Sequence, residues 1–146
     1  MYSITYRSVC DPSFDEKDIL KMLLKSQKKN KRLGITGCLL YHNNKFVQLI
    51  EGNEITVKTL YATILEDPRH SNVQLLHSAF SPLRLFRDWS MVFNNLNTKT
   101  DQVEDKRLLF DTIYHESDIV SSPGNSKITL WTNVYDILYA EGSLTA

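Results

Sequence analysis

The stretch Ile35–Gly52, ITGCLLYHNNKFVQLIEG, constrains the fold of this chain more than any other. It holds two apolar runs separated by the polar sequence His42–Asn44, whose asparagines tolerate positive φ angles. Two apolar runs joined by a short turn of this kind predict a β-hairpin. The second run, Phe46–Ile50, is interrupted by Gln48.

Gln48 is a polar residue where the pattern favours an apolar one. Side chains along a strand alternate between two faces, so Gln48 shares a face with Phe46 and Ile50. A buried amide needs partners for its acceptor oxygen and its two donor hydrogens, and these two apolar neighbours supply none. The sequence therefore predicts that groups elsewhere in the fold form hydrogen bonds with Gln48.

Length and charge limit the classes of protein that fit. A chain of 146 residues, 42% of them hydrophobic, can build one compact domain with an appendage but not two ordinary domains. A formal net charge of zero gives no electrostatic case for a nucleic-acid partner. The local exception is the basic cluster 28–32, which either grips a phosphate group or complements the dipole at a helix end.

Cysteine usage and apolar runs give no sign of an extracellular or membrane protein. Cys10 and Cys38 are too few and too isolated for a disulfide framework or a zinc site. The first residues have no signal-peptide pattern, and no apolar run is long enough to span a membrane. We therefore expect a cytoplasmic protein with no metal site and no membrane partner.

Two amphipathic helices are predicted, one on each side of the hairpin. Ser13 and Glu16 have the spacing of a capping box, so the first helix spans about residues 14–30, with Gly34 just beyond it. Asn53 is typical of a helix N-cap, and Pro68 disfavours helical geometry at the residue before it. The second helix therefore lies between Asn53 and Pro68.

Apolar residues also predict strands at about 3–9, 73–80 and 89–93. Together with the hairpin they give the order strand, helix, strand, strand, helix, strand, strand, which predicts an α+β ferredoxin-like sandwich (βαββαββ). From right-handed crossovers we expect the first and third strands to be parallel neighbours at the sheet centre, with both helices on one face. Tyr6 then lies beside Gln48.

Residues 97–146 are predicted to be a C-terminal helical extension of a domain that covers residues 1–96. Helical apolar patterns occur at about 108–114 and 130–138, and the extension is too small to be a second domain. It either covers the open face of the sheet or presents Trp131, Tyr135 and Leu138 to a partner as an exposed stripe.

Sequence patterns of common enzymes are absent. The chain has no Gly-rich phosphate loop, no HExxH, no paired cysteines and no Gly-x-Ser-x-Gly, and its four histidines show no metal spacing. An acylphosphatase-like enzyme stays open as an alternative for this fold. It needs an anion-cradling loop near the first strand, and Ser8–Ser13 contains no glycine.

Five short segments together resemble the BLUF family of blue-light sensors that use FAD. They are Tyr6 with Ser8, Asn30–Leu40 (NKRLGITGCLL), Phe46–Gly52 (FVQLIEG), Asp67–His70 (DPRH) and Phe86–Met91 (FRDWSM). The match covers roughly residues 2–95, and it rests on the joint spacing of these segments.

The resemblance implies a flavin, FAD or alternatively FMN, held between the two helices. It implies that Tyr6 is the redox-active tyrosine, that Gln48 is the amide that switches hydrogen bonds to flavin N5 and O4, and that Trp89 and Met91 are a signalling pair. Lys29 stands where the family often has His or Asn, so we expect it to serve the phosphates. The implied flavin-binding residues are Tyr6, Ser26, Lys29, Asn30, Arg32, Ile35, Gln48, Asp67, Arg69 and His70, with Leu23, Leu24, Ile35 and Ile64 as apolar walls.

The resemblance thus implies a photoreceptor module that is not itself an enzyme. Its signal is expected to leave through contacts with a downstream signalling protein that the sequence does not name, in a homo-oligomer. Besides the acylphosphatase-like enzyme, a flavin-free ferredoxin-like binding module stays open, and it leaves Gln48 without a flavin partner.

Overall fold

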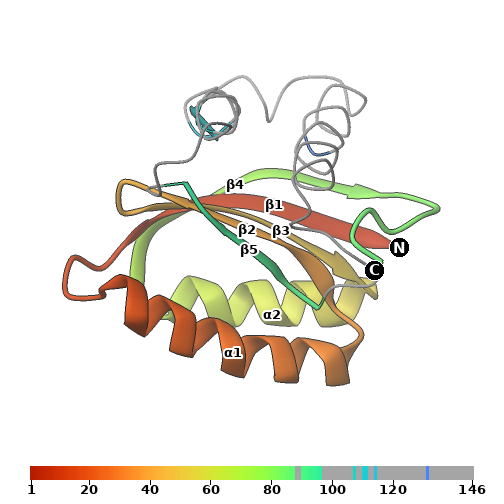
Figure 1. The fold of residues 1–146 in the computed structure, drawn as a ribbon. Helices are drawn as coiled ribbons and strands as arrows, with labels where there is room; N and C mark the ends of the chain where they lie inside the picture. The colour runs from red at the N-terminus through yellow and green to blue at the C-terminus, as the bar shows by residue number, and fades with distance from the viewer. Residues whose placement is uncertain (88–89, 97–106, 108–109, 112–113, 115–130, 132–146) are drawn as a thin grey trace.

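The computed structural model of the chain describes residues 1–87, 90–96, 107, 110, 111, 114 and 131. The elements are β1 (Tyr2–Cys10), α1 (Glu16–Leu33), β2 (Thr36–His42), β3 (Lys45–Gly52), α2 (Glu54–Glu66), β4 (His70–Phe80) and β5 (Val92–Asn95). The strands form one sheet in the order β4-β1-β3-β2-β5, and both helices lie on one face of it (Figure 1). The predicted α+β ferredoxin-like fold is confirmed.

Strands β1 and β3 are neighbours at the sheet centre, as predicted, but they are antiparallel, with Tyr6 directly opposite Gln48. The predicted parallel direction is wrong. The crossover through α1 joins β1 to β2, so these two strands run the same way, and the tight hairpin then reverses the chain before β3.

The hairpin between β2 and β3 has the predicted turn. Asn43 and Asn44 have φ angles of 48° and 61°, as the two central residues of a type I′ turn require. This turn fixes the register in which Leu39 pairs with Gln48. The turn therefore places Gln48 on the same face of the hairpin as Leu39.

Helix α1 begins two residues later than predicted. Its N-cap is Asp15, whose carboxylate accepts the backbone N–H of Asp18 at 2.8 Å, and the Asp18 carboxylate accepts the N–H of Asp15 at 3.2 Å. Ser13 is not the cap because its N–H and its hydroxyl both donate to the Asp11 carboxylate, each at 2.9 Å.

The other predicted helix ends are confirmed. Gly34 follows α1 in the left-handed conformation, with φ of 68°. Asn53 caps α2 by accepting the N–H of Ile55 at 3.1 Å, and Asp67, the residue before Pro68, is the C-cap.

The sheet separates two apolar clusters. On the helix face, which α1 and α2 cover, the sheet residues Ile4, Tyr6 and Ile50 pack with Leu23 and other helix residues. On the opposite face, Val47, Leu49 and Phe86 pack with Phe110, Tyr114 and Trp131.

Trp131 thus packs on the sheet, 5% exposed, and its indole N–H donates to the Thr5 hydroxyl at 3.0 Å. Tyr135, Leu138 and most of the predicted helices of the extension lie outside the described residues.

Candidate functional site

The hydrogen-bond partners of Gln48 come from β1 and from the residue just before β5, because its own strand supplies none. The Tyr6 hydroxyl donates a hydrogen bond to Gln48 Oε1. Gln48 Nε2 donates to the sulfur of Met91 at 3.3 Å. The two ends of the amide therefore contact chemically different groups, a hydroxyl donor and a thioether acceptor. The prediction that groups elsewhere in the fold form hydrogen bonds with Gln48 is confirmed.

Helix α1 holds the backbone of the segment that carries Met91. Gln27 Nε2 donates to the Met91 carbonyl at 2.9 Å, and Asn30 Nδ2 donates to the Ser90 carbonyl at 3.3 Å. Asn30 is 3% exposed, so these bonds lie between the helix and the sheet. Trp89, the other member of the predicted signalling pair, lies outside the described residues.

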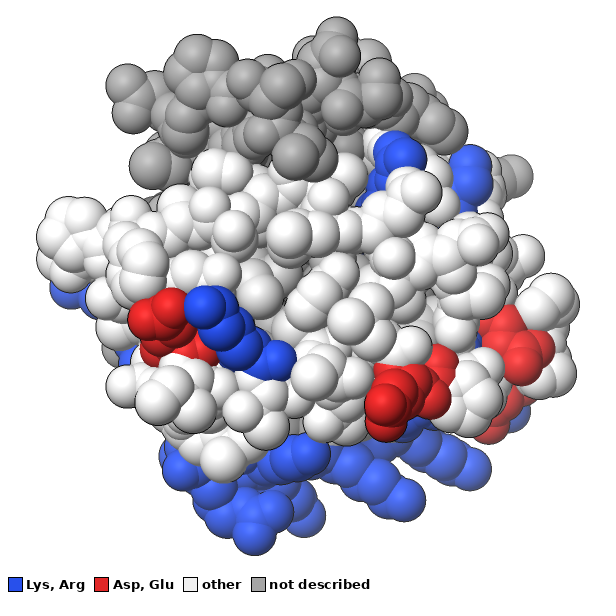
Figure 2. All heavy atoms as spheres, turned by 180° about the vertical axis from the view of Figure 1, so that it is seen from behind, with Lys and Arg blue, Asp and Glu red and all other residues white. Residues whose placement is uncertain are grey.

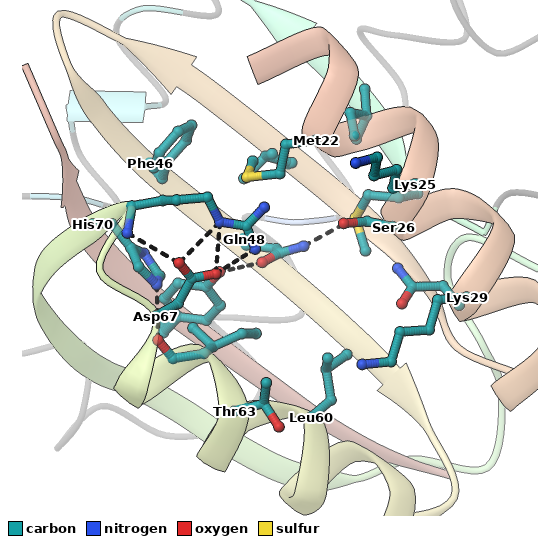
Figure 3. A pocket seen from close by; sticks show the side chains of 17 residues that line it. Met22, Lys25, Ser26, Lys29, Phe46, Gln48, Leu60, Thr63, Asp67 and His70 are labelled. Atoms are coloured by element: carbon teal, nitrogen blue, oxygen red, sulfur yellow. Dashed lines mark hydrogen bonds and ion pairs between the residues drawn. The ribbon is translucent and has the colours of Figure 1, made fainter. Parts of the chain in front are cut away.

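A cavity of about 260 Å³ lies between α1, α2 and the sheet, with Gln48 in its wall (Figure 3). Ser26 and Lys29 of α1 stand across it from Leu60 and Thr63 of α2. Most of the residues predicted to bind a flavin line this cavity. They are Tyr6, Ser26, Lys29, Asn30, Gln48, Asp67, Arg69 and His70, and Met91 lines it as well.

One end of the cavity is formed by Asp67, Arg69 and His70, each of which is held by hydrogen bonds. Arg69 Nε lies 2.8 and 2.9 Å from the two Asp67 carboxylate oxygens. These hydrogen bonds from Arg69 hold the pKa of the Asp67 carboxyl below its ordinary value. His70 Nε2 donates to the Ile64 carbonyl at 2.8 Å, and its Nδ1, 2.9 Å from the Ser8 oxygen, accepts a hydrogen bond from the serine hydroxyl.

Tyr6 is a buried neutral phenol in this arrangement. Burial raises the pKa of Tyr6 far above its ordinary value, and Tyr61 and Asp67 raise it further, while Arg69 opposes them. The Tyr6 ring also lies against Tyr61, with ring centroids 5.7 Å apart, and edge-on to His70 at 6.2 Å. The hydroxyl therefore keeps its proton for the hydrogen bond to Gln48.

Three residues assigned to the flavin site do not line the cavity. Arg32 is exposed near the end of α1. Ile35 is buried at 1% exposure, and its side chain packs against Gly52 instead. Leu24, the predicted wall residue, is 62% exposed because it follows Leu23, which points inward, by one position, a rotation of about 100° around the helix.

The sequence interpretation also missed residues of the site. Periodicity alone indicates several of them: Met22 lies four positions before Ser26 on a helix, and Phe46 lies two positions before Gln48 on a strand. Gln27 has no such signal, because its partner is a backbone carbonyl of the distant residue Met91. The missed residues are Met22, Lys25, Gln27, Leu39, Phe46, Leu60 and Thr63.

A second cavity, of about 320 Å³, lies on the opposite face beneath residues 81–85. Its buried carboxylate, Glu51, already accepts the N–H groups of Leu85 at 2.9 Å and Phe86 at 2.6 Å, and the hydroxyl of Thr36 at 3.1 Å. These bonds tie β3 to the segment that leads toward β5, so Glu51 has a structural role there.

Among the described residues, no three His, Cys, Asp or Glu side chains are grouped to hold a metal ion. In the same part of the chain, no helix has the length and apolar character to cross a membrane.

Comparison with known proteins decides the family. The profile of a family described as sensors of blue-light using FAD matches residues 1–92. The chain belongs to the BLUF family. As a BLUF protein, it is a blue-light photoreceptor of the flavin-binding class.

The relatives of this BLUF protein include much longer proteins. The chain is 32% identical over 132 residues to the blue light- and temperature-regulated antirepressor BluF of Escherichia coli (strain K12), and the match covers 88% of this chain and 29% of that protein. It is 36% identical over 77 residues to the photoactivated adenylate cyclase subunit beta of Euglena longa, covering 53% of this chain and 9% of that one. The chain spans less than a third of the curated relatives that it matches.

Solved structures show the same fold. The dark-state structure of BlrB, a BLUF protein, superposes with a TM-score of 0.72 at 29% identity, and the match covers 96% of each chain. A bacterial light-regulated adenylyl cyclase superposes with the same TM-score at 32% identity, over 77% of this chain and 33% of that one.

Proposed function

We propose that this protein binds FAD in the cavity between α1 and α2 and senses blue light through the hydrogen bonds of Gln48. The observation that carries this proposal is the chain of contacts Tyr6–Gln48–Met91 in the cavity wall. It gives an amide at the cavity a donor on one side and an acceptor on the other.

The cavity fits a planar ring that is apolar on its faces and polar at its edge. Leu23, Leu39 and Ile64 supply apolar walls, while Asn30 and Gln48 supply amides. Its volume of about 260 Å³ lies just below the usual range for pockets that enclose a whole ligand, so it suits the ring system, with the tail of the cofactor outside. The exposed Lys25 and Lys29 at the margin suit the phosphates.

We assign the ring to Asn30, Gln48 and the apolar walls, and the ribityl-phosphate side to Ser26, Lys25 and Lys29. Asp67, Arg69 and His70 close the other end of the cavity, where Arg69 donates to Asp67 and the His70 ring bonds to the Ser8 hydroxyl and the Ile64 carbonyl. When bound, a flavin supplies absorption of blue light and an excited state that is a strong oxidant. FMN shares this ring and fits the same assignment.

Tyr6 and Gln48 supply the proton chemistry at the site. The Tyr6 hydroxyl already points at Gln48 Oε1, so the proton that leaves Tyr6 on oxidation has an acceptor in place. Its raised pKa keeps the phenol protonated before light arrives.

Met91 distinguishes the two orientations of the Gln48 amide. In the present orientation Nε2 donates to the Met91 sulfur. If the amide rotates by half a turn, its oxygen faces that sulfur, which has no proton to donate, and the hydrogen bond is lost. A hydrogen bond in a buried site is worth about 1 kcal/mol, which is enough to shift a two-state segment roughly fivefold.

We propose that loss of the hydrogen bond from Gln48 moves Met91 and that a partner protein binds differently as a result. The chain then acts as a sensor in the cytoplasm without catalysis of its own. Relatives named as an antirepressor and as photoactivated cyclases support a role in protein signalling. An acylphosphatase-like activity needs a cation near the loop Ser8–Ser13 to hold an anion, and Arg7 is the one next to it. This activity is disfavoured because Arg7 donates to Gln74 at 2.7 Å and to the Tyr114 carbonyl, on the face of the sheet opposite the helices.

Absorbance of the purified protein tests this proposal. We expect a yellow protein that retains FAD on gel filtration, with a flavin band that shifts reversibly to longer wavelength under blue light. A preparation that takes up neither FAD nor FMN contradicts the binding part and favours the flavin-free module. Flavin binding without a light-induced shift contradicts the sensing part.

A further inference from the structure

The outward side of α1 concentrates positive charge. This helix carries seven Lys or Arg side chains and two acidic ones, both in its first turn, in a chain whose formal net charge is zero. Figure 2 shows lysine and arginine gathered along the lower edge of the molecule, where α1 lies. We call the exposed residues Lys17, Leu20, Lys21, Leu24, Lys28, Lys31 and Arg32 the basic surface.

Two leucines stand within this charge. Leu20 is 49% exposed and Leu24 is 62% exposed. They lie four residues apart, so they are neighbours on one side of the helix, and Lys21 and Lys28 flank them. An adjacent pair of exposed leucines gives this side of the helix an apolar contact area of the kind that a partner helix covers.

The other side of the same helix contacts the segment that carries Met91. Gln27 and Asn30 donate to the carbonyls of Met91 and Ser90. Met91 in turn accepts from Gln48. A displacement of Met91 therefore acts on α1 through two hydrogen bonds, without passing through the C-terminal extension.

We propose that the basic surface of α1 docks an acidic amphipathic helix of a partner protein and that light changes the affinity of this docking. Only the light-dependent part rests on the proposed function. Glutamates of the partner pair with Lys17, Lys21 and Lys28, and its apolar side chains cover the leucine pair.

The leucines decide between this occupant and other anionic ones. Phosphates of a nucleic acid leave Leu20 and Leu24 facing a charged, hydrated backbone, with no apolar contact in return. A lipid surface needs a broad apolar side, and here the apolar part is one pair of residues surrounded by cations. A partner helix with acidic and apolar residues matches both components.

Binding of a fluorescent synthetic peptide tests the docking in the dark. The probe is a helical peptide with leucines four residues apart and glutamates around them, and its matched control has serines in place of the leucines. We expect the leucine peptide to bind at least tenfold more tightly than the serine peptide. We expect Lys21→Glu combined with Lys28→Glu to weaken it at least tenfold, with bound flavin and its red shift retained.

A charge-matched variant checks that the effect is local. Lys58→Glu makes the same charge change on an exposed position of α2, and we expect less than a twofold effect, against at least threefold for Lys28→Glu. Equal effects of the two variants contradict docking at α1. Equal binding of the leucine and serine peptides also contradicts the proposal.

Other probes test the other occupants. If the protein binds phosphatidylglycerol vesicles or a DNA duplex more tightly than it binds the leucine peptide, and the Lys21→Glu, Lys28→Glu variant loses this binding, the partner-helix assignment is overturned. Self-association in sedimentation that the same variant abolishes overturns it as well, in favour of a second copy of this chain.

Illumination tests the coupling separately. We expect blue light to change the peptide affinity of the wild type at least twofold and to leave that of Gln48→Leu unchanged. A normal red shift without any change in affinity overturns the coupling. Absence of the red shift contradicts the proposed function, while binding in the dark still decides whether the surface docks the peptide.

Discussion

The two faces of the sheet use the same strands for different purposes. On the helix face, β1 contributes Tyr6 and β3 contributes Gln48 to the wall of a cavity. On the opposite face lies the residue of β1 just before Tyr6, Thr5, whose hydroxyl accepts a hydrogen bond from the indole N–H of Trp131. Because side chains alternate along a strand, one backbone supports a polar site on one side and a packed aromatic cluster on the other.

The opposite face is built for packing. Phe86 meets Trp131 edge-on with ring centroids 6.3 Å apart, and Phe110 stacks on Tyr114 at 5.7 Å. Arg7 and Lys45 lie over the Tyr114 ring at 5.3 and 5.2 Å. We therefore expect substitutions of the polar cavity residues on the helix face to alter light sensing with little effect on stability, and substitutions in the aromatic cluster on the opposite face to do the reverse.

The largest expected effect is on the helix face. Tyr6→Phe removes the hydroxyl that donates to Gln48 and also the proton that leaves on oxidation. We expect complete loss of the light-induced red shift, with flavin still bound and a stability change of about 1 kcal/mol or less. Difference absorbance and urea unfolding check the two parts. A normal photocycle in this variant contradicts the assignment of light sensing to the polar residues of the helix face.

Trp131→Ala tests the opposite face. It removes a ring that is 5% exposed, together with its hydrogen bond to Thr5. We expect the free energy of unfolding to fall by about 3–5 kcal/mol, the usual range for a buried aromatic residue, while the red shift is retained under conditions where the protein is folded. Loss of the red shift in the folded variant shows that light sensing also depends on the opposite face.

Glu51→Gln tests a polar contact on the opposite face, where Glu51 connects β3 to residues 85–86. The amide keeps one acceptor oxygen but cannot accept all three hydrogen bonds now made by Thr36, Leu85 and Phe86. We expect a loss of about 1–3 kcal/mol in urea unfolding. Glu54→Gln, on the exposed first turn of α2, is the control, and an equal loss there contradicts the role of Glu51.

The smallest expected effect is the pH dependence of stability from Asp67. Its pKa lies below the ordinary value because of the hydrogen bonds from Arg69, so the stability that the pair contributes is present above about pH 4. This stability is lost as the pH falls through the lowered pKa. We expect wild type to be more stable than Asp67→Asn at pH 7 and the difference to disappear in acid. A difference that is constant with pH contradicts the ion pair.

Local signals in the sequence predicted the elements that local chemistry builds. The asparagines of the hairpin turn, the Asn53 cap and the residue before Pro68 each act within a few positions, and the structure has them as predicted. The start of α1 was missed because two possible caps lie two residues apart, and Asp11 binds Ser13. The choice depends on a competing hydrogen bond that sequence spacing does not rank.

Long-range geometry was predicted less well. The direction of β3 relative to β1 follows from counting chain reversals, and the sequence interpretation counted one too few. Leu24 was wrongly predicted to face the sheet together with Leu23, because two adjacent leucines do not indicate which of them points inward. The bond from Gln27 to the Met91 backbone depends on tertiary structure, so the sequence has no pattern for it.

The central claim is that light is read through the hydrogen bonds of Gln48. A light-minus-dark absorbance spectrum of Gln48→Leu, recorded beside wild type with flavin bound to both, tests it most directly. The leucine is similar in size to the glutamine but has neither the acceptor for Tyr6 nor the donor for Met91. We predict a reversible red shift in wild type and none in Gln48→Leu. A red shift of normal size in Gln48→Leu contradicts the claim.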